Sequence, residues 1–285
     1  MMIYKDMDIG LGGMAMKNIL KIMLMMITIF TIAGSAVYAA EIPVSDQDQL
    51  ITSSDWTEIS NLQDEMKKEE PDATIDYDKA LKVYVDCNLI KLQTADTKKL
   101  TSALESANYV WVIPFKMEKT YGMFTVAKGL PLSEEAKSVL TKAEQEEVKN
   151  HAGKWMITET AEHTVEPYYD ILLEKREALS DCTRVVLVGS QPGMRQPVAL
   201  GMDDETARIW ISLGYQYPVM EKIPETQNVE SGVYSFESVA EISDTYIEDS
   251  EVSTGVGVQS RSSMKYVAGI GIIVIGSILI LSVLK

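Results

Sequence analysis

The run of residues 266–284 (YVAGIGIIVIGSILILSVL) constrains this chain more than any other feature, because it contains no charged side chain over 19 positions. An α-helix rises about 1.5 Å per residue, so this run spans about 28 Å, close to the hydrocarbon thickness of a bilayer. Arg261 and Lys265 precede the run and Lys285 follows it, where basic residues meet the membrane interface. We therefore expect residues 266–284 to form one membrane-spanning helix in contact with lipid.

A second apolar run, residues 22–33, has the surroundings of a secretory signal peptide. Lys17 and Lys21 form a positive segment before it. Small residues follow it, and Val37 and Ala39 occupy the −3 and −1 positions of a cut after Ala39. This order of charge, apolar run and small residues predicts export across a membrane.

We expect residues 1–39 to be the signal peptide, with Met14 or Met16 as the true start, because the residues before Met14 fit no part of a signal. An uncleaved signal that stays in the membrane as an anchor is the alternative. Together with residues 266–284, the signal predicts a single-pass protein of the cell membrane. Most of the chain is then extracytoplasmic, where it would form a surface protein.

The chain is acidic outside the signal. Once residues 1–39 are set aside, 23 basic and 40 acidic residues remain, a net charge of −17. Such a surface repels nucleic acid at long range, and no basic stripe offsets it, so nucleic-acid binding is excluded. The composition, 46% apolar and 24% charged, is typical of a folded globular chain and argues against general disorder.

Residues 40–220 predict one α+β domain with a mixed or mostly antiparallel sheet and packed helices, because consecutive strands are joined by short turns. Strand patterns occur at 80–85 (with 88–92 as its continuation), 109–115, 121–128, 154–160, 184–188, 198–202 and 207–213. Helical patterns occur near 55–66, at 100–107, from Ser133 to Gly153 as one long helix, and after Pro167. Asp55 and Glu58 have a spacing close to that of a capping box for the first of these helices.

The segment 221–265 is rich in Ser and Thr and carries nine acidic and three basic residues. This composition predicts a self-repelling stalk that holds the domain off the membrane. Four apolar residues offer the alternative that part of the segment docks along the domain: Val233, Phe236, Val239 and Ile242.

The strongest metal-binding candidate is the segment around His163. Three carboxylates and one imidazole lie within eight residues and could hold a divalent cation if a loop gathered them: Glu159, Glu162, His163 and Glu166. Their spacing matches no metal motif on a helix. The alternative is that acidic residues precede a helix because they complement its dipole.

The chain has two cysteines, Cys87 and Cys182, both in the part predicted to be exported. A disulfide between them would close a loop of about 95 residues and stabilise the fold by about 4–5 kcal/mol in the chain-entropy model. Two buried free thiols are the alternative. Neither cysteine has the neighbours of a metal or redox site.

The segment from Val188 to Gly193 follows an apolar strand and is similar to the nucleophile elbow of hydrolases. Val188 stands where the elbow needs its first glycine, and Pro192 begins a turn instead of a helix. A hairpin loop explains the segment better. The aromatic residues of 109–111 and 168–169 could line a ligand groove, and core packing explains them equally well.

No catalytic or cofactor motif is present, so we expect no cofactor. The sequence favours a non-enzymatic, membrane-anchored surface protein that binds a protein, peptide or envelope component. One alternative is an accessory subunit of a membrane protein complex, which would use residues 266–284 for partner contact as well. A second alternative is an extracytoplasmic hydrolase with an unrecognised site.

Overall fold

The structure is a computed structural model that describes residues 42–247, apart from 164–165, 190, 192–196 and 215–227. All described residues belong to one compact unit. The expected signal peptide (1–39) and membrane helix (266–284) lie outside them. Of the helices in the described part, none combines the length and the apolar character that crossing a bilayer requires.

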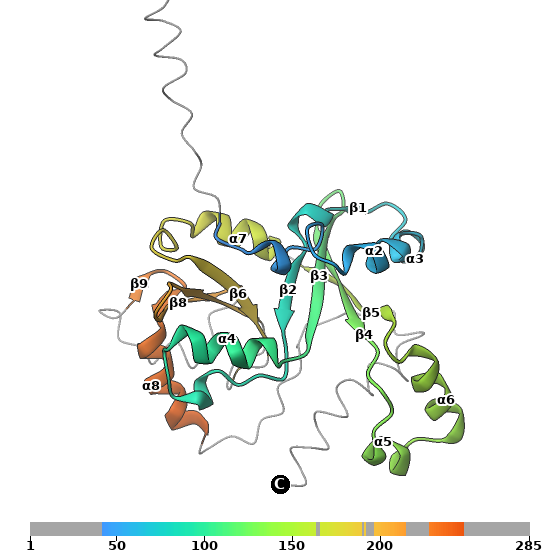
Figure 1. The fold of residues 1–285 in the computed structure, drawn as a ribbon. Helices are drawn as coiled ribbons and strands as arrows, with labels where there is room; N and C mark the ends of the chain where they lie inside the picture. Colours follow the sequence, from blue (N-terminus) through green and yellow to red (C-terminus); the bar gives the residue numbers. More distant parts are fainter. Residues whose placement is uncertain (1–41, 164–165, 190, 192–196, 215–227, 248–285) are drawn as a thin grey trace, which may run out of the picture. The chain divides into compact units, whose positions relative to one another are not determined.

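A ten-stranded sheet forms the centre of the described region (Figure 1). Nine strands follow the order β5-β4-β3-β2-β6-β7-β8-β10-β9, and the short β1 pairs with β3. The strands are β1 (Thr74–Ile75), β2 (Leu81–Tyr84), β3 (Tyr109–Lys116), β4 (Tyr121–Lys128), β5 (Trp155–His163), β6 (Arg184–Val188), β7 (Val198–Met202), β8 (Ala207–Ser212), β9 (Asn228–Glu230) and β10 (Val233–Ser235).

Helices accompany the sheet, which confirms the expected α+β class. The α-helices are α2 (Trp56–Ile59), α3 (Gln63–Glu69), α4 (Thr97–Glu105), α5 (Glu134–Val139), α6 (Lys142–His151), α7 (Tyr168–Glu174) and α8 (Phe236–Ile247). Short 3₁₀ helices are η1 (Asp46–Asp48), η2 (Ser60–Leu62), η3 (Tyr77–Lys79) and η4 (Ile90–Leu92).

The sheet consists of two antiparallel halves joined by one parallel pair of strands. The first half, β2 to β5, is a run of antiparallel neighbours, and so is the second half from β6 to β10. The halves meet where β2 runs parallel to β6, with Val83 opposite Leu187 and Tyr84 opposite Val188. The chain reaches β6 only after completing the first half and passing through α7, as a parallel join requires a long connection. The sheet is therefore mostly antiparallel, as expected.

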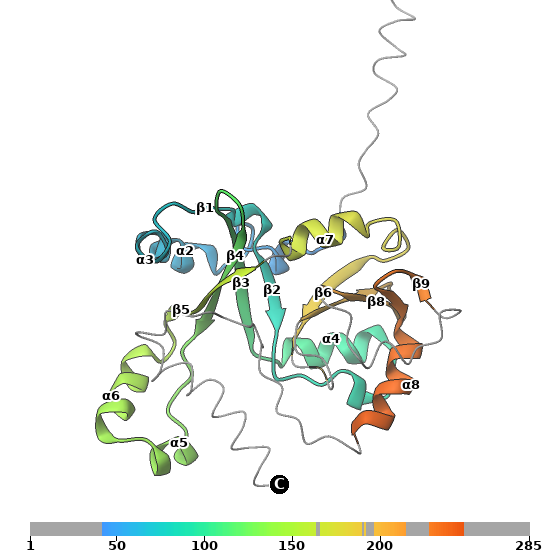
Figure 2. The same cartoon turned by 180° about the vertical axis from the view of Figure 1, so that it is seen from behind.

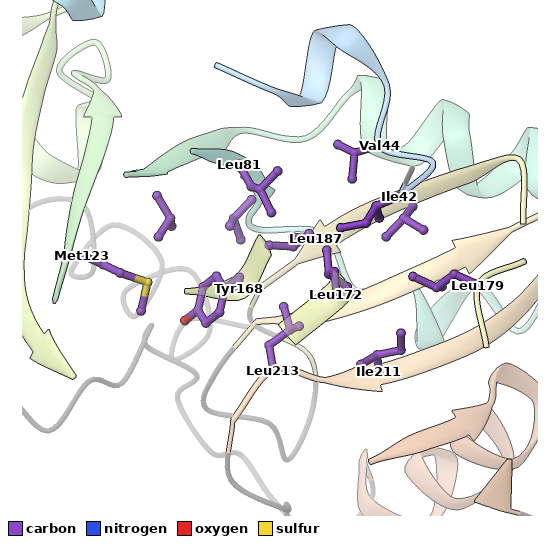
Figure 3. Close-up of a cluster of buried hydrophobic side chains, with 14 of the residues drawn as sticks. Ile42, Val44, Leu81, Met123, Tyr168, Leu172, Leu179, Leu187, Ile211 and Leu213 are labelled. Carbon is purple, nitrogen blue, oxygen red and sulfur yellow. The ribbon is translucent and has the colours of Figure 1, made fainter. Parts of the chain in front are cut away.

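Alternation along the strands sorts the apolar side chains onto two faces. On one face lies the α7 core, whose side chains converge between the strands and α7 (Figure 3). Its main members are Val83, Val112, Leu172, Val185, Leu187 and Ile211. The N-terminal residues Ile42 and Val44 also belong to it.

The opposite face carries two separate cores. The α4 core lies over the second half of the sheet, under α4 and α8, with Leu100, Leu104, Val186, Val188, Trp210 and Phe236 as main members. The α3 core lies over the first half, with Ile59, Met66, Trp111, Ile113, Phe115 and Phe124 as main members. On this face, the junction between β2 and β6 lies between the two cores.

Three local expectations differ from the structure. The long helix expected from Ser133 to Gly153 is two helices, because Leu140 is extended (ψ 142°) and Thr141 caps α6 with a capping box to Glu144. Residues 88–92 do not continue the strand at 80–85 but form η4. Asp55 makes no side-chain cap, because its carboxylate is used elsewhere, as described below.

Part of the segment expected to be a stalk is folded onto the domain. Residues 228–247 form β9, β10 and α8, and β10 pairs with β8. Val233, Phe236 and Val239 are each no more than 3% exposed, and Ile242 packs against the α4 core. The docking alternative is thus confirmed for this stretch, because its apolar side chains complete the core over Trp210. Residues 228–247 therefore belong to the folded domain, whereas the rest of the segment 221–265 lies outside the described residues.

Candidate functional site

Charged and aromatic side chains meet on one face of the sheet, between the α3 and α4 cores. We call this group the Asp48 cluster, and its members are Asp48, Asp55, Lys82, Tyr84, Tyr109, Trp111 and Arg184. Asp48 is only 2% exposed, and no other charged side chain among the described residues is as buried. Carboxylates are rarely buried unless they are paired, so the cluster is the first place to look for chemistry.

Strand register brings most of the cluster together. Lys82 lies opposite Trp111, and Tyr84 lies opposite Tyr109, in the antiparallel pair β2–β3. Since side chains alternate along a strand, these four point to the same face. Arg184 begins β6, next to β2, and joins them from the other half of the sheet.

Asp48 accepts hydrogen bonds from three side chains. The Tyr84 hydroxyl donates to Oδ1 at 2.7 Å, and Nη2 of Arg184 donates to Oδ2 at 3.0 Å. The Ser45 hydroxyl also donates to Oδ2, at 2.6 Å. The burial of this carboxylate is therefore offset by charge-assisted hydrogen bonds from two different strands. Burial and the Asp48 carboxylate raise the pKa of Tyr84 well above its usual value.

Lys82 lies among three aromatic rings. Its Nζ is 4.5 Å from the ring centroid of Tyr109, 5.2 Å from that of Trp111 and 5.8 Å from that of Tyr84. It is also 3.8 Å from Oδ1 of Asp48. Such distances are those of cation–π contacts. Burial lowers the pKa of Lys82, while the carboxylates of Asp48 and Asp55 act in the opposite direction.

Asp55 closes the cluster toward the α3 core. Its Oδ2 accepts from the Tyr109 hydroxyl at 2.8 Å and from Nε1 of Trp111 at 3.0 Å. This use explains why Asp55 does not cap the helix that follows it. Burial and the Asp55 carboxylate raise the pKa of Tyr109.

The Asp48 cluster holds two cations and two carboxylates, and both carboxylates are occupied by donors. Its geometry fits a network that ties the two halves of the sheet together at the β2–β6 junction. Neither carboxylate is free to act as a base. Removing one member of such a buried network leaves its partner charge unpaired, which is strongly destabilising.

The structure does not bring the predicted metal ligands Glu159 and Glu162 together. Glu159 lies opposite Thr125 and Glu162 opposite Gly122, with two residues between them on β5. They point to opposite faces of the sheet: Glu159 interacts with Tyr168 of the α7 core, whereas Glu162 interacts with Glu70 beyond α3. Burial raises the pKa of Glu159.

The other two predicted metal ligands are Glu166 and His163. Glu166 is exposed and precedes α7. The backbone of His163 ends β5, but its side chain lies outside the described part, so metal binding through His163 stays a prediction. Within the part that is described, no three His, Cys, Asp or Glu side chains gather as a metal site.

Both cysteines are free thiols. Cys87 packs against the α4 core, whereas Cys182 belongs to the α7 core, so the sheet lies between them. In the structure the two cysteines are unpaired, as in the alternative of two free thiols. Burial raises the pKa of Cys87 to about 12 and that of Cys182 to about 11, which makes both poor nucleophiles.

The segment after Val188 is a hairpin connection. Strands β6 and β7 pair antiparallel from Arg184–Met202 to Val188–Val198, whereas a nucleophile elbow needs a helix after the strand. Ser190 lies outside the described residues. Gln191 is fully buried, and its amide group donates to the carbonyl of Cys87 and accepts from the backbone of Leu89.

Core packing also accounts for the aromatic pairs that were candidates for a groove, since Trp111 is 0% and Tyr168 is 6% exposed. Sequence reasoning missed Asp48, Lys82 and Arg184. Lys82 carried a usable signal, because it is the one charged residue inside the apolar strand pattern 80–85. Asp48 carried none, because it lies in a short polar turn.

Comparisons with protein-family models, with curated proteins and with solved structures give no match for this chain. Its function is therefore inferred from the geometry of its own residues.

Proposed function

We propose that this protein is a non-catalytic binding module, exported and held at the membrane by residues 266–284, and that it contacts another protein through a helical arm. The arm is residues 129–154, which connect β4 to β5 and contain α5 and α6. It lies beyond the ends of these two strands in both views of the fold (Figures 1 and 2).

The observation that carries the proposal is that the arm contributes nothing to the cores. None of its described side chains is buried. Val139 is 62% exposed and Leu130 is 38% exposed, which makes them two of the five exposed large apolar residues in the described region. These apolar side chains make no contact with the cores of this chain and are therefore available to a partner.

The Asp48 cluster supports the non-catalytic part of the proposal. Asp48 is the most buried charged side chain among the described residues, yet the carboxylates of the cluster are occupied by internal donors. The antiparallel pairing of β6 with β7 likewise argues against a nucleophile elbow after Val188. Binding of another protein is also compatible with a strongly acidic chain that repels nucleic acid.

The test is photo-crosslinking in the membranes of the cells that make the protein. A photoreactive side chain is placed at position 139 of the full chain, with position 92 as the matched control. Leu92 is also exposed, at 43%, but lies in η4, outside the arm. We expect a protein adduct from position 139 and none from position 92.

Two results would overturn the proposal. The first is equal or absent crosslinking at both positions. The second is turnover of a substrate by the purified full chain that is lost on Ser190→Ala or His163→Ala. Fractionation that places the chain outside the membrane would overturn its location.

A further inference from the structure

The first described residues, 42–50, lie between β2 and β6, and we call this segment the latch. Strands β2 and β6 pair with each other at only two positions each, and their parallel register, continued back by two residues, would bring Leu81 opposite Val185. Instead Val185 pairs with Val44, and Leu81 pairs with Gln49. The latch therefore occupies the place where the two halves of the sheet would otherwise meet.

Backbone hydrogen bonds fix both ends of the latch. The N–H of Val185 donates to the carbonyl of Pro43 at 2.8 Å, and the N–H of Leu50 donates to the carbonyl of Ala80 at 3.2 Å. Val185 and Ala80 are both fully buried. Undocking the latch would take their partners away, and unpaired buried backbone groups are costly. The latch is therefore an integral part of the folded sheet.

The latch also passes from one face of the sheet to the other. Ile42 and Val44 are buried in the α7 core (Figure 3). Leu50 is fully buried in the α3 core, on the opposite face. Asp48 lies between these ends and accepts hydrogen bonds from side chains of both β2 and β6. Both strands and both cores thus hold the latch in place.

The beginning of the latch lies next to the predicted signal cleavage site. Only Ala40 and Glu41 stand between the bond after Ala39 and buried Ile42. Two fully extended residues span about 7 Å at most. A protease binds several residues around the bond that it cuts, and it cuts poorly where the backbone is buried and hydrogen-bonded. A docked latch therefore leaves too little free chain for cleavage after Ala39.

We infer that the latch couples processing to folding, so that the bond after Ala39 is cut only while the latch is undocked. Hydrolysis adds one water molecule across this bond and leaves a carboxylate on Ala39 and an ammonium group on Ala40. If folding comes first, the latch docks with the signal still attached, and residues 1–39 stay as a second membrane anchor. The order of the two events decides between the cleaved and uncleaved forms. This inference rests on the export part of the proposed function and adds to it.

The test is cleavage of the folded, full-length precursor by a purified signal peptidase in detergent. The decisive variant has a flexible linker of about six Gly and Ser residues between Glu41 and Ile42, which lengthens the free chain while the latch stays docked. This variant should be cut at least about tenfold faster than the wild-type precursor, because cutting of the wild type has to wait for local opening. Mass spectrometry identifies the product that begins at Ala40. Equal unfolding midpoints show that the linker does not act by unfolding.

A second pair of variants changes the docking itself. Ile42→Asp places a charge in the α7 core and should also speed the cut. Its matched control is Ile51→Asp, because Ile51 directly follows the latch and is 38% exposed. The control should be cut as slowly as the wild type.

Two kinds of result would overturn the inference. Equal, measurable rates for the wild-type and linker precursors, or equal rates for Ile42→Asp and Ile51→Asp, would overturn it and leave the proposed function intact. No cut after Ala39 in any precursor would overturn it as well, and would also contradict the signal peptide on which the proposed export depends.

Discussion

Arg184 and Asp48 lie 136 positions apart in the sequence, and Nη2 of Arg184 donates a hydrogen bond to Oδ2 of Asp48 at 3.0 Å. This contact ties the segment before β2 to the first residue of β6. It therefore spans the junction at which the two antiparallel halves of the sheet meet.

Replacing Asp48 by alanine should destabilise the fold by about 3–5 kcal/mol, because it leaves the half-buried cations Arg184 and Lys82 without their shared carboxylate. Urea unfolding of the full chain, followed by tryptophan fluorescence, measures the change. The matched control is Asp46→Ala, which removes the same charge from an exposed position of the same 3₁₀ helix, η1. We expect the control to lie within about 0.5 kcal/mol of the wild type. Equal effects of the two substitutions would contradict the role of Asp48.

Glu159 should make stability depend on pH. Burial raises its pKa above the usual 4.5, so the folded state holds the proton more tightly than the unfolded state. Stability contributed by protonated Glu159 is thus present below pH 4.5 and is lost as the pH rises through the folded pKa. Glu159→Gln should therefore be more stable than the wild type at pH 7 and equal to it near pH 4. Denaturant unfolding at both pH values tests this, with exposed Glu177→Gln as a control that shows no such change.

The two cysteines should be present as thiols of low reactivity. We expect intact mass spectrometry to give the same mass with and without reductant, and maleimide to label the native protein slowly at pH 8. Both sites should label quickly after unfolding, because burial no longer raises their pKa values. A mass about 2 Da lower without reductant would show a disulfide and contradict the structure.

Phe236 should contribute to stability although it lies in an acidic segment. Its side chain is 3% exposed, and its ring centroid is 5.9 Å from that of Trp210. Phe236→Ala should cost about 3–5 kcal/mol, as expected for a large core side chain. Thermal and urea unfolding measure the loss, and the exposed neighbour Glu237 supplies the control Glu237→Ala. A neutral Phe236→Ala would mean that α8 is not part of the folded domain.

Gly129→Ala should open the base of the arm, where the N–H of Gly129 donates to the carbonyl of Lys154 and the N–H of Gly153 donates back to Gly129. The new Cβ would lie 2.1 Å from the carbonyl oxygen of His151. The expected cost is about 1–3 kcal/mol, as for other overpacked positions. Hydrogen exchange should rise in α5 and α6 while the strands stay protected. Gly153→Asn is the control, since Gly153 has φ +76° and asparagine tolerates that conformation. Unchanged exchange in Gly129→Ala would contradict the closed base.

Several elements were predictable because their signals are local. Residues 109–115 and 184–188 are apolar runs of strand length, and both are strands. The predicted helix begins at Ser133, and the Ser133 side chain caps α5. The break at Leu140 was also visible in principle, because Thr141 and Glu144 have the spacing of a capping box. The apolar pattern across 133–153 instead favours one continuous helix.

The candidate site was much less predictable. Lys82 stands out in an apolar strand, but two of its three rings come from β3. Its carboxylates come from η1 and from the residue before α2. Glu159 and Glu162 are close in sequence, yet they point to opposite faces of the sheet. They lie three positions apart on β5, and side chains along a strand alternate between its two faces. On a strand, proximity along the chain predicts a shared site for residues two positions apart but not for residues three positions apart.

Residue patterns alone therefore determined the kind of each main element and the α+β class, because alternation and helical periodicity depend on neighbours a few positions apart. Only the tertiary structure decided that β2 pairs with β6, that Asp48 meets Arg184, and that residues 228–247 complete the α4 core. Alternation of apolar and polar residues indicates that a strand has a buried face, but it does not indicate which strand or helix covers that face. That choice depends on the burial and charge pairing of the whole domain at once.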